Sequence, residues 1–95
     1  MLQLAVSEDF GALRKRILVV DDDTSLRQLI IEGLSTFDYD IAEADSGTEA
    51  IRKIEAQAYD LVITDMMMPG MSGMELLTRI REVKPETAVL VITAY

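Results

Sequence analysis

The chain has 95 residues, of which 49% are hydrophobic and 27% are charged, a balance typical of one small globular domain. It contains neither cysteine nor histidine, which excludes disulfides, thiolate metal sites and an imidazole general base. The formal net charge of −8 argues against binding of nucleic acid or an anionic membrane by this chain and favours divalent cations or a basic partner. Because no apolar run is long enough to span a bilayer and the N-terminus is a poor signal peptide, we expect a cytoplasmic protein.

Strands and helices are predicted to alternate along most of the chain. Residues 1–16 show no clear period and are expected to form an N-terminal extension to a domain over residues 17–95. Short apolar or alternating runs predict strands, and apolar residues at three- and four-residue spacing predict the helices between them. The predicted strands lie at 17–20, 39–44, 60–64 and 88–93, and the helical patterns run from Leu26 to Phe37, from Ala50 to Ala58 and from Leu76 to Val83. This alternation predicts an α/β fold, a doubly wound parallel sheet with helices on both faces.

Each predicted helix begins near a serine that stands three residues before Gln or Glu. The segments are SLRQ at 25–28, SGTE at 46–49 and SGME at 72–75. This is the capping-box pattern, in which the serine oxygen and the later side chain satisfy free N–H groups at the start of the helix. We therefore predict that the three serines cap the three helices.

Carboxylates follow two of the predicted strands. Asp21, Asp22 and Asp23 follow the first strand, Asp65 follows the third, and Thr93 ends the fourth. Because ligands of parallel α/β sheets bind at the carboxyl ends of strands, these side chains are expected to gather in one site. Clustered carboxylates repel one another, and oxygen ligands at a shallow site suit Mg²⁺. Each residue also has a simpler interpretation, as a helix cap, a turn residue or an ordinary strand hydroxyl.

Three segments, ILVVDDD, LVITDMMMPGMSG and VLVITA, resemble signature segments of the receiver domain of two-component response regulators. The resemblance covers residues 17–95. It implies a flavodoxin-like sheet with strand order 2-1-3-4 for the four strands present. It also implies a phosphorelay protein that accepts a phosphoryl group from a sensor histidine kinase or phosphotransfer domain and is not a turnover enzyme.

The resemblance also implies roles for residues of the acidic cluster. Asp65 matches the phosphoryl acceptor, and Asp21 and Asp22 match the acidic pair that holds Mg²⁺, with Asp22 as the direct ligand. Met67 matches the position whose backbone carbonyl completes the metal site. A carboxylate can attack the phosphorus of a phosphohistidine, so the absence of histidine from this chain is no obstacle.

Other positions match the switch and the loop of the family. Thr93 matches the switch hydroxyl and Ala94 the small residue beside it. Pro69 and Gly73 are expected to shape the turn after Asp65. The methionines at 66, 68 and 74 are expected to be filler, with Met68 packed inward; a soft copper site at positions 66, 68, 71 and 74 is the alternative.

The chain departs from the family pattern after its fourth strand. A complete receiver domain has a fifth strand, two further helices and a lysine on that strand; Lys15, Lys53 and Lys84 do not follow such a strand. We therefore expect an incomplete domain with a marginal fold, or self-association through the exposed fourth strand. The output domain or partner protein is not predicted.

Two other functions remain open from the sequence. DDDTS after an apolar strand is similar to the motif of haloacid-dehalogenase-like phosphohydrolases, with Asp21 as nucleophile and Asp23 as acid/base. Alternatively, the chain is a non-phosphorylated pseudo-receiver that only binds partners; the missing lysine favours this interpretation, and the intact acidic pair and acceptor oppose it.

Overall fold

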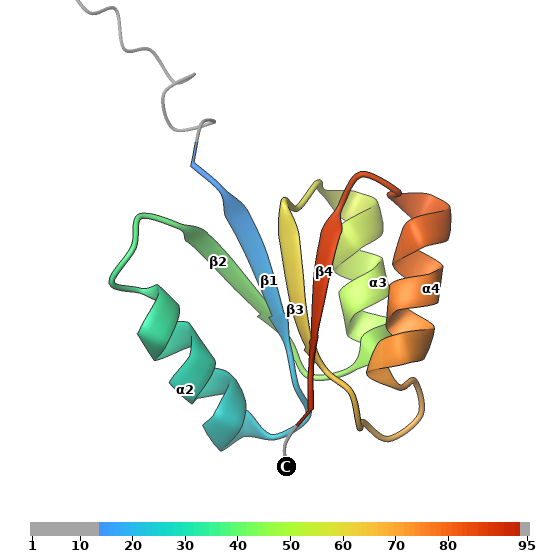
Figure 1. Cartoon of the computed structure of the whole chain (residues 1–95), viewed down its shortest axis with the longest axis horizontal. Coiled ribbons are helices and arrows are strands. Elements are labelled where there is room, and N and C mark those ends of the chain that lie inside the picture. Colours follow the sequence, from blue (N-terminus) through green and yellow to red (C-terminus); the bar gives the residue numbers. More distant parts are fainter. Residues whose placement is uncertain (1–13, 94–95) are drawn as a thin grey trace, which may run out of the picture.

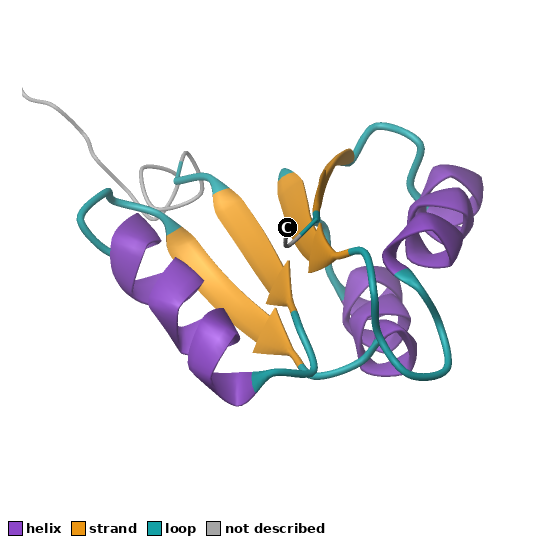
Figure 2. Cartoon of the chain, turned by 60° about the horizontal axis from the view of Figure 1, so that its bottom comes forward, coloured by secondary structure: helices purple, strands orange, loops and turns teal. Residues whose placement is uncertain are grey.

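The computed structural model describes residues 14–93, which form a four-stranded parallel sheet in the order β2-β1-β3-β4. Helix α2 covers one face of the sheet, and α3 and α4 cover the other (Figures 1 and 2). The elements are β1 (Arg16–Val20), α2 (Thr24–Leu34), β2 (Asp40–Ala44), α3 (Gly47–Ala56), β3 (Leu61–Asp65), α4 (Gly73–Val83) and β4 (Ala88–Ile92). The predicted doubly wound, flavodoxin-like sheet and its strand order are confirmed. None of the helices between residues 14 and 93 has the length and apolar character needed to cross a membrane.

The central strand β1 supplies side chains to both faces of the sheet, as its continuous apolar run predicts. Leu18 and Val20 lie in the larger core, beneath α3 and α4, together with Ile54 and Leu76. The alternate residues of β1 pack toward α2 in a smaller cluster, against Ile30 and its neighbours on that helix. Because both clusters are anchored on β1, the carboxyl end of this strand is held firmly between the two layers.

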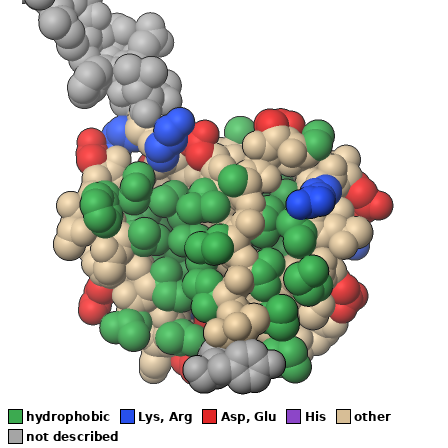
Figure 3. Space-filling model, viewed as in Figure 1, with side chains coloured by type: hydrophobic (Ala, Val, Ile, Leu, Met, Phe, Trp, Pro, Cys, Tyr) green, Lys and Arg blue, Asp and Glu red, His purple; other side chains and the backbone are tan. Residues whose placement is uncertain are grey.

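Strand β4 lies at the edge of the sheet formed by the described residues, paired with β3 alone. Its apolar sequence is similar to that of a buried strand, yet none of its residues is buried, and Leu90 is 52% exposed. On the α2 side of the sheet, apolar side chains gather over an open surface (Figure 3). Helix α2 contributes further exposed apolar surface, since Leu29 is 64% exposed.

Two of the three predicted helix caps are confirmed. The Ser46 hydroxyl accepts from the N–H of Glu49 at 3.1 Å. The Ser72 hydroxyl accepts from the N–H of Glu75 at 3.1 Å, and the Glu75 carboxylate accepts from the N–H of Ser72 at 3.3 Å, which completes a capping box. The Glu49 carboxylate instead accepts from the N–H of Asp45, one residue earlier than the pattern predicts.

The prediction that Ser25 caps the first helix is wrong. Helix α2 begins at Thr24, and the carboxylate of Asp23 accepts from the N–H of Leu26 at 3.2 Å. Asp23 still has extended backbone angles, whereas Ser25 already lies inside the first turn. The helix also ends at Leu34 rather than at Phe37, whose exposed ring packs against Tyr39 with their centroids 5.5 Å apart.

Candidate functional site

Three carboxylates converge at the carboxyl end of the sheet. Asp21 directly follows β1 and Asp65 ends the neighbouring strand β3, with Val20 and Thr64 in register one residue earlier. Oxygen atoms of Asp21, Asp22 and Asp65 lie within 4.8 Å of one another. The predicted gathering of these three residues is thus present, at the end of the sheet where the strand arrows of Figure 1 point.

The three carboxylates differ in their exposure. Asp21 is only 1% exposed, Asp65 is half-buried and Asp22 is exposed. The N–H of Asp23 donates to a carboxylate oxygen of Asp21 at 2.9 Å, and the N–H of Asp21 donates to the Ala44 carbonyl of β2 at 3.1 Å. Asp21 is therefore buried and held in place at the base of the site. The carboxylate of Asp22 faces solvent, where a ligand can reach it.

Burial is the main reason why the pKa of Asp21 is raised above its ordinary value. The hydrogen bond from the Asp23 N–H lowers this pKa, and the negative charges of Asp65, Asp22 and Asp23 raise it again. Mutually repelling carboxylates with oxygen-only ligands form the donor set that a hard divalent cation prefers. The residues of this cluster therefore fit Mg²⁺ on chemical grounds.

The loop after Asp65 is held at both ends by backbone contacts. The N–H of Met66 donates to the Ile92 carbonyl at 2.9 Å, and the N–H of Gly73 donates to the Met66 carbonyl at 2.8 Å. Gly70 has a positive φ of 81°, which a residue without Cβ adopts most easily. Pro69 is exposed. The positive φ thus adds Gly70 to the residues that are predicted to shape this turn.

The methionines of this loop occupy different surroundings. Met68 is 8% exposed and lies in the core, as predicted, whereas the side chain of Met67 is 76% exposed. Met74 is 49% exposed, so the expectation that it is filler is wrong. The distribution does not support a shared copper site, because the thioether of Met68 is enclosed by the core while that of Met74 faces solvent.

The predicted switch residues lie at the end of the described chain. Asp65 is in register with Ile92, the last residue of β4, so Thr93 comes directly after that pair. Thr93 is exposed and follows the last residue of the strand. Ala94 lies outside the described residues.

An ion pair beside the site did not follow from the sequence pattern. The Arg27 Nε of α2 donates to a carboxylate oxygen of Glu43 on β2 at 2.7 Å, and its Nη1 donates to the Asp21 carbonyl at 2.7 Å. Lys53 of α3 donates to the carbonyl of Glu43. One feature of the sequence could have indicated these contacts: Arg27 lies one helical turn after Asp23. Because helical side chains lean back toward the N-terminus of the helix, its guanidinium group can reach the loop that precedes α2.

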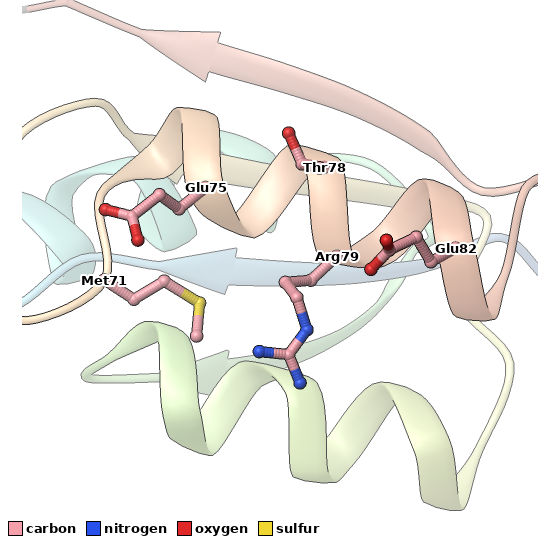
Figure 4. A pocket seen from close by; sticks show the side chains of 5 residues that line it. All are labelled: Met71, Glu75, Thr78, Arg79 and Glu82. Atoms are coloured by element: carbon pink, nitrogen blue, oxygen red, sulfur yellow. The ribbon is translucent and has the colours of Figure 1, made fainter.

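A shallow pocket of about 300 Å³ lies along α4, away from the carboxylate cluster. Its lining comes from α4 and the loop before it, with the Met71 and Arg79 side chains directed toward α3 (Figure 4). The remaining lining residues are Glu75, Thr78 and Glu82. The pocket contains no residue of the acidic cluster.

Residues 17–95 match the family model described as the response regulator receiver domain. The chain is 32% identical over 81 residues to the response regulator receiver protein CpdR of Brucella abortus, covering 85% of this chain and 68% of CpdR. It is 44% identical over 79 residues to the transcriptional regulatory protein ResD of Bacillus subtilis, covering 83% of this chain and 32% of ResD. The chain thus spans about two thirds of CpdR and one third of ResD.

Solved structures agree with this assignment. The response regulator protein TrrA of Thermotoga maritima, crystallised in complex with Mg²⁺-BeF, superposes with a TM-score of 0.81 at 46% identity. The superposition covers 85% of this chain and 70% of TrrA. A response regulator receiver domain from Clostridium thermocellum gives a TM-score of 0.78 at 37% identity, covering 83% of this chain and 64% of that one. The chain therefore belongs to the receiver domain family of two-component response regulators.

Proposed function

We propose that Asp65 accepts a phosphoryl group in a two-component phosphorelay and that Mg²⁺ assists at the carboxylate cluster. The observation that carries the proposal is the convergence of three carboxylates from two neighbouring strands within 4.8 Å. Asp22 and Asp65 would bind the ion together with the Met67 carbonyl, and Asp21 would contribute its negative charge from the buried side. When bound, Mg²⁺ supplies neutralisation of negative charge on the carboxylates and the phosphoryl oxygens.

The residues of this chain supply the nucleophile and its position. A carboxylate oxygen of Asp65 forms the new bond to phosphorus, and the phosphorus–nitrogen bond of the donor phosphohistidine breaks. The electron pair of that bond stays on the donor imidazole, which takes up a proton. The half-buried position of Asp65 at the end of β3 supports this role, because a rigid strand fixes the carboxylate while leaving access from solvent.

The partners follow from the same proposal. A sensor histidine kinase or phosphotransfer domain would donate the phosphoryl group, since this chain has no histidine. Thr93 and Ala94 would form the switch that responds to the modified Asp65. An output domain or separate partner would then read the state of the receiver.

The phosphohydrolase alternative requires Asp21 as the nucleophile. Asp21 is 1% exposed and one of its carboxylate oxygens accepts the Asp23 N–H, so its approach to phosphorus is obstructed. Asp23 caps α2 rather than facing a substrate as an acid/base. Both observations favour Asp65 as the nucleophile.

A pseudo-receiver that binds partners without phosphorylation is the second candidate.

Chemical mapping of the acyl phosphate tests the proposal. The chain is incubated with Mg²⁺ and a small phosphoryl donor, treated with hydroxylamine, and digested for peptide mass analysis. We expect a hydroxamate on the peptide that contains Asp65 in the wild type. The hydroxamate should lie on the same peptide in the Asp21→Asn variant. A hydroxamate at Asp21 would support the phosphohydrolase, and no modification at either aspartate would support the pseudo-receiver.

A further inference from the structure

Arg27 connects three elements beside the carboxylate cluster. It lies in the first turns of α2, and its side chain is only 12% exposed. Its Nε donates to Glu43 of β2 at 2.7 Å, and its Nη1 donates to the backbone carbonyl of Asp21 at 2.7 Å. One guanidinium group therefore joins α2, β2 and the loop that follows β1.

Glu43 is itself held in place from two other elements. The side chain of Gln28 on α2 donates to the same carboxylate oxygen at 2.9 Å, and Lys53 of α3 donates to the Glu43 backbone carbonyl. The backbone of Glu43 is in register with Val19 of β1. Arg27 is thus oriented by a carboxylate that the sheet fixes, and its second donor is aimed at Asp21.

The Asp21 carbonyl belongs to the peptide group that joins Asp21 to Asp22. The N–H of Asp21, which belongs to the preceding peptide group, donates to the Ala44 carbonyl, and Arg27 donates to the Asp21 carbonyl itself. A planar peptide bound at its carbonyl has little rotational freedom. The direction in which the chain enters Asp22 is therefore set, and with it the direction in which the exposed Asp22 side chain leaves the backbone.

We propose that Arg27, oriented by Glu43, is a positioning residue that fixes the Asp21–Asp22 peptide and so preorganises the Asp22 carboxylate for Mg²⁺. The role in Mg²⁺ binding rests on the proposed function. The fixing of the Asp21–Asp22 peptide by Arg27 does not, because that contact is present without metal. The planar fork of arginine is required, because it offers two donors at a set angle to two acceptors. Lysine retains the charge without the fork.

Binding of Mg²⁺ alone, followed by NMR amide shifts, tests the metal part of the inference. Arg27→Gln should weaken Mg²⁺ binding roughly tenfold, as the loss of a group that orients a metal ligand typically does. Arg27→Lys should restore little of the affinity. The matched control is Arg16→Gln, which removes the exposed ion pair with Asp40 (3.1 Å) at the opposite end of β1 and should leave the affinity within about twofold.

Amide hydrogen exchange of the metal-free variants supplies a second readout. The Asp23 N–H, which donates to the Asp21 carboxylate, should exchange faster in Arg27→Gln than global unfolding accounts for, and should be unchanged in Arg16→Gln. Mg²⁺ affinity and Asp23 exchange equal to those of the wild type would overturn the inference. If the wild-type chain binds no Mg²⁺, both the proposed function and the role of Arg27 in metal binding are wrong. The exchange rate of the Asp23 N–H then decides whether Arg27 fixes the Asp21–Asp22 peptide.

Discussion

Gly73 and Asp65 are in direct backbone contact: a Cβ atom on Gly73 would lie 2.3 Å from the Asp65 carbonyl oxygen. Gly73 is the first residue of α4, and its N–H also donates to the Met66 carbonyl. The start of α4 is therefore fixed against the end of β3. The proposed acceptor owes its position to a helix as well as to its own strand.

Substitution of Gly73 by alanine should destabilise the protein. The added methyl group meets rigid backbone, so we expect the free energy of unfolding to fall by about 2 kcal/mol, the typical cost of overpacking. Gly33 is the matched control, because it lies in α2 with nothing within 4 Å of its Cβ position. Gly33→Ala should raise the stability by about 0.5–1 kcal/mol. Urea denaturation measures both, and a stable Gly73→Ala variant would contradict the contact.

The helix caps give a second prediction, in which the structure and the sequence pattern disagree. Ser72→Ala removes the capping box of α4 and should cost about 1 kcal/mol of stability. Ser25→Ala should change the stability by less than about 0.5 kcal/mol, because Ser25 is exposed and Asp23 caps α2. Equal losses for the two serines in urea denaturation would show that Ser25 acts as a cap after all.

The raised pKa of Asp21 predicts how stability depends on pH in the metal-free protein. Ionisation of Asp21 is harder in the folded than in the unfolded chain, so the stability that protonated Asp21 provides is lost as pH rises from its ordinary value of 3.8 through the folded pKa. Asp21→Asn should therefore be more stable than the wild type at neutral pH. The amide oxygen can still accept the Asp23 N–H.

The difference should shrink as the pH falls and disappear below 3.8, where the wild-type carboxyl becomes protonated in both the folded and the unfolded state. Saturating Mg²⁺ should stabilise the wild type more than the variant, because Asp21 contributes to the proposed site. The measurement is urea denaturation of the two proteins at neutral and acidic pH, with and without Mg²⁺. An Asp21→Asn variant that is less stable at neutral pH without Mg²⁺ would argue against an ionisation penalty.

The open edge of β4 predicts self-association of the 95-residue chain. An apolar edge strand with free backbone groups favours pairing with a second chain, and Leu90 on β4 is 52% exposed. Leu90→Lys should shift the chain toward monomer in sedimentation velocity, while Leu29→Lys, on exposed α2, should have little effect. A compact wild-type monomer at high concentration would refute this prediction.

Local sequence signals predicted much of the fold because they report directly on backbone structure. The apolar run of β1 fits a strand buried on both faces, and Ser72 with Glu75 forms the box that its spacing indicates. The predicted cap at Ser25 was wrong because Asp23, two residues earlier, supplies a carboxylate at a position where the chain is still extended. Competing caps two residues apart cannot be ranked from the pattern alone.

The interactions around the site were harder to predict because they depend on tertiary register. The carboxylates could be placed together, since the ends of parallel strands meet at one edge. The contact of Arg27 with Glu43 requires the pairing of β1 with β2, in which Glu43 lies opposite Val19. The contact of Gly73 with Asp65 depends on the angle at which α4 leaves the loop, which no local pattern specifies.

The most direct test of the central claim is the intact mass of this chain after incubation with Mg²⁺ and a small phosphoryl donor, beside Asp65→Asn. Phosphorylation at Asp65 predicts the addition of one phosphoryl group to the wild type, its dependence on Mg²⁺, and its absence from the variant. An addition that persists in Asp65→Asn, or no addition to a folded wild-type chain that binds Mg²⁺, would contradict the assignment of Asp65 as the acceptor.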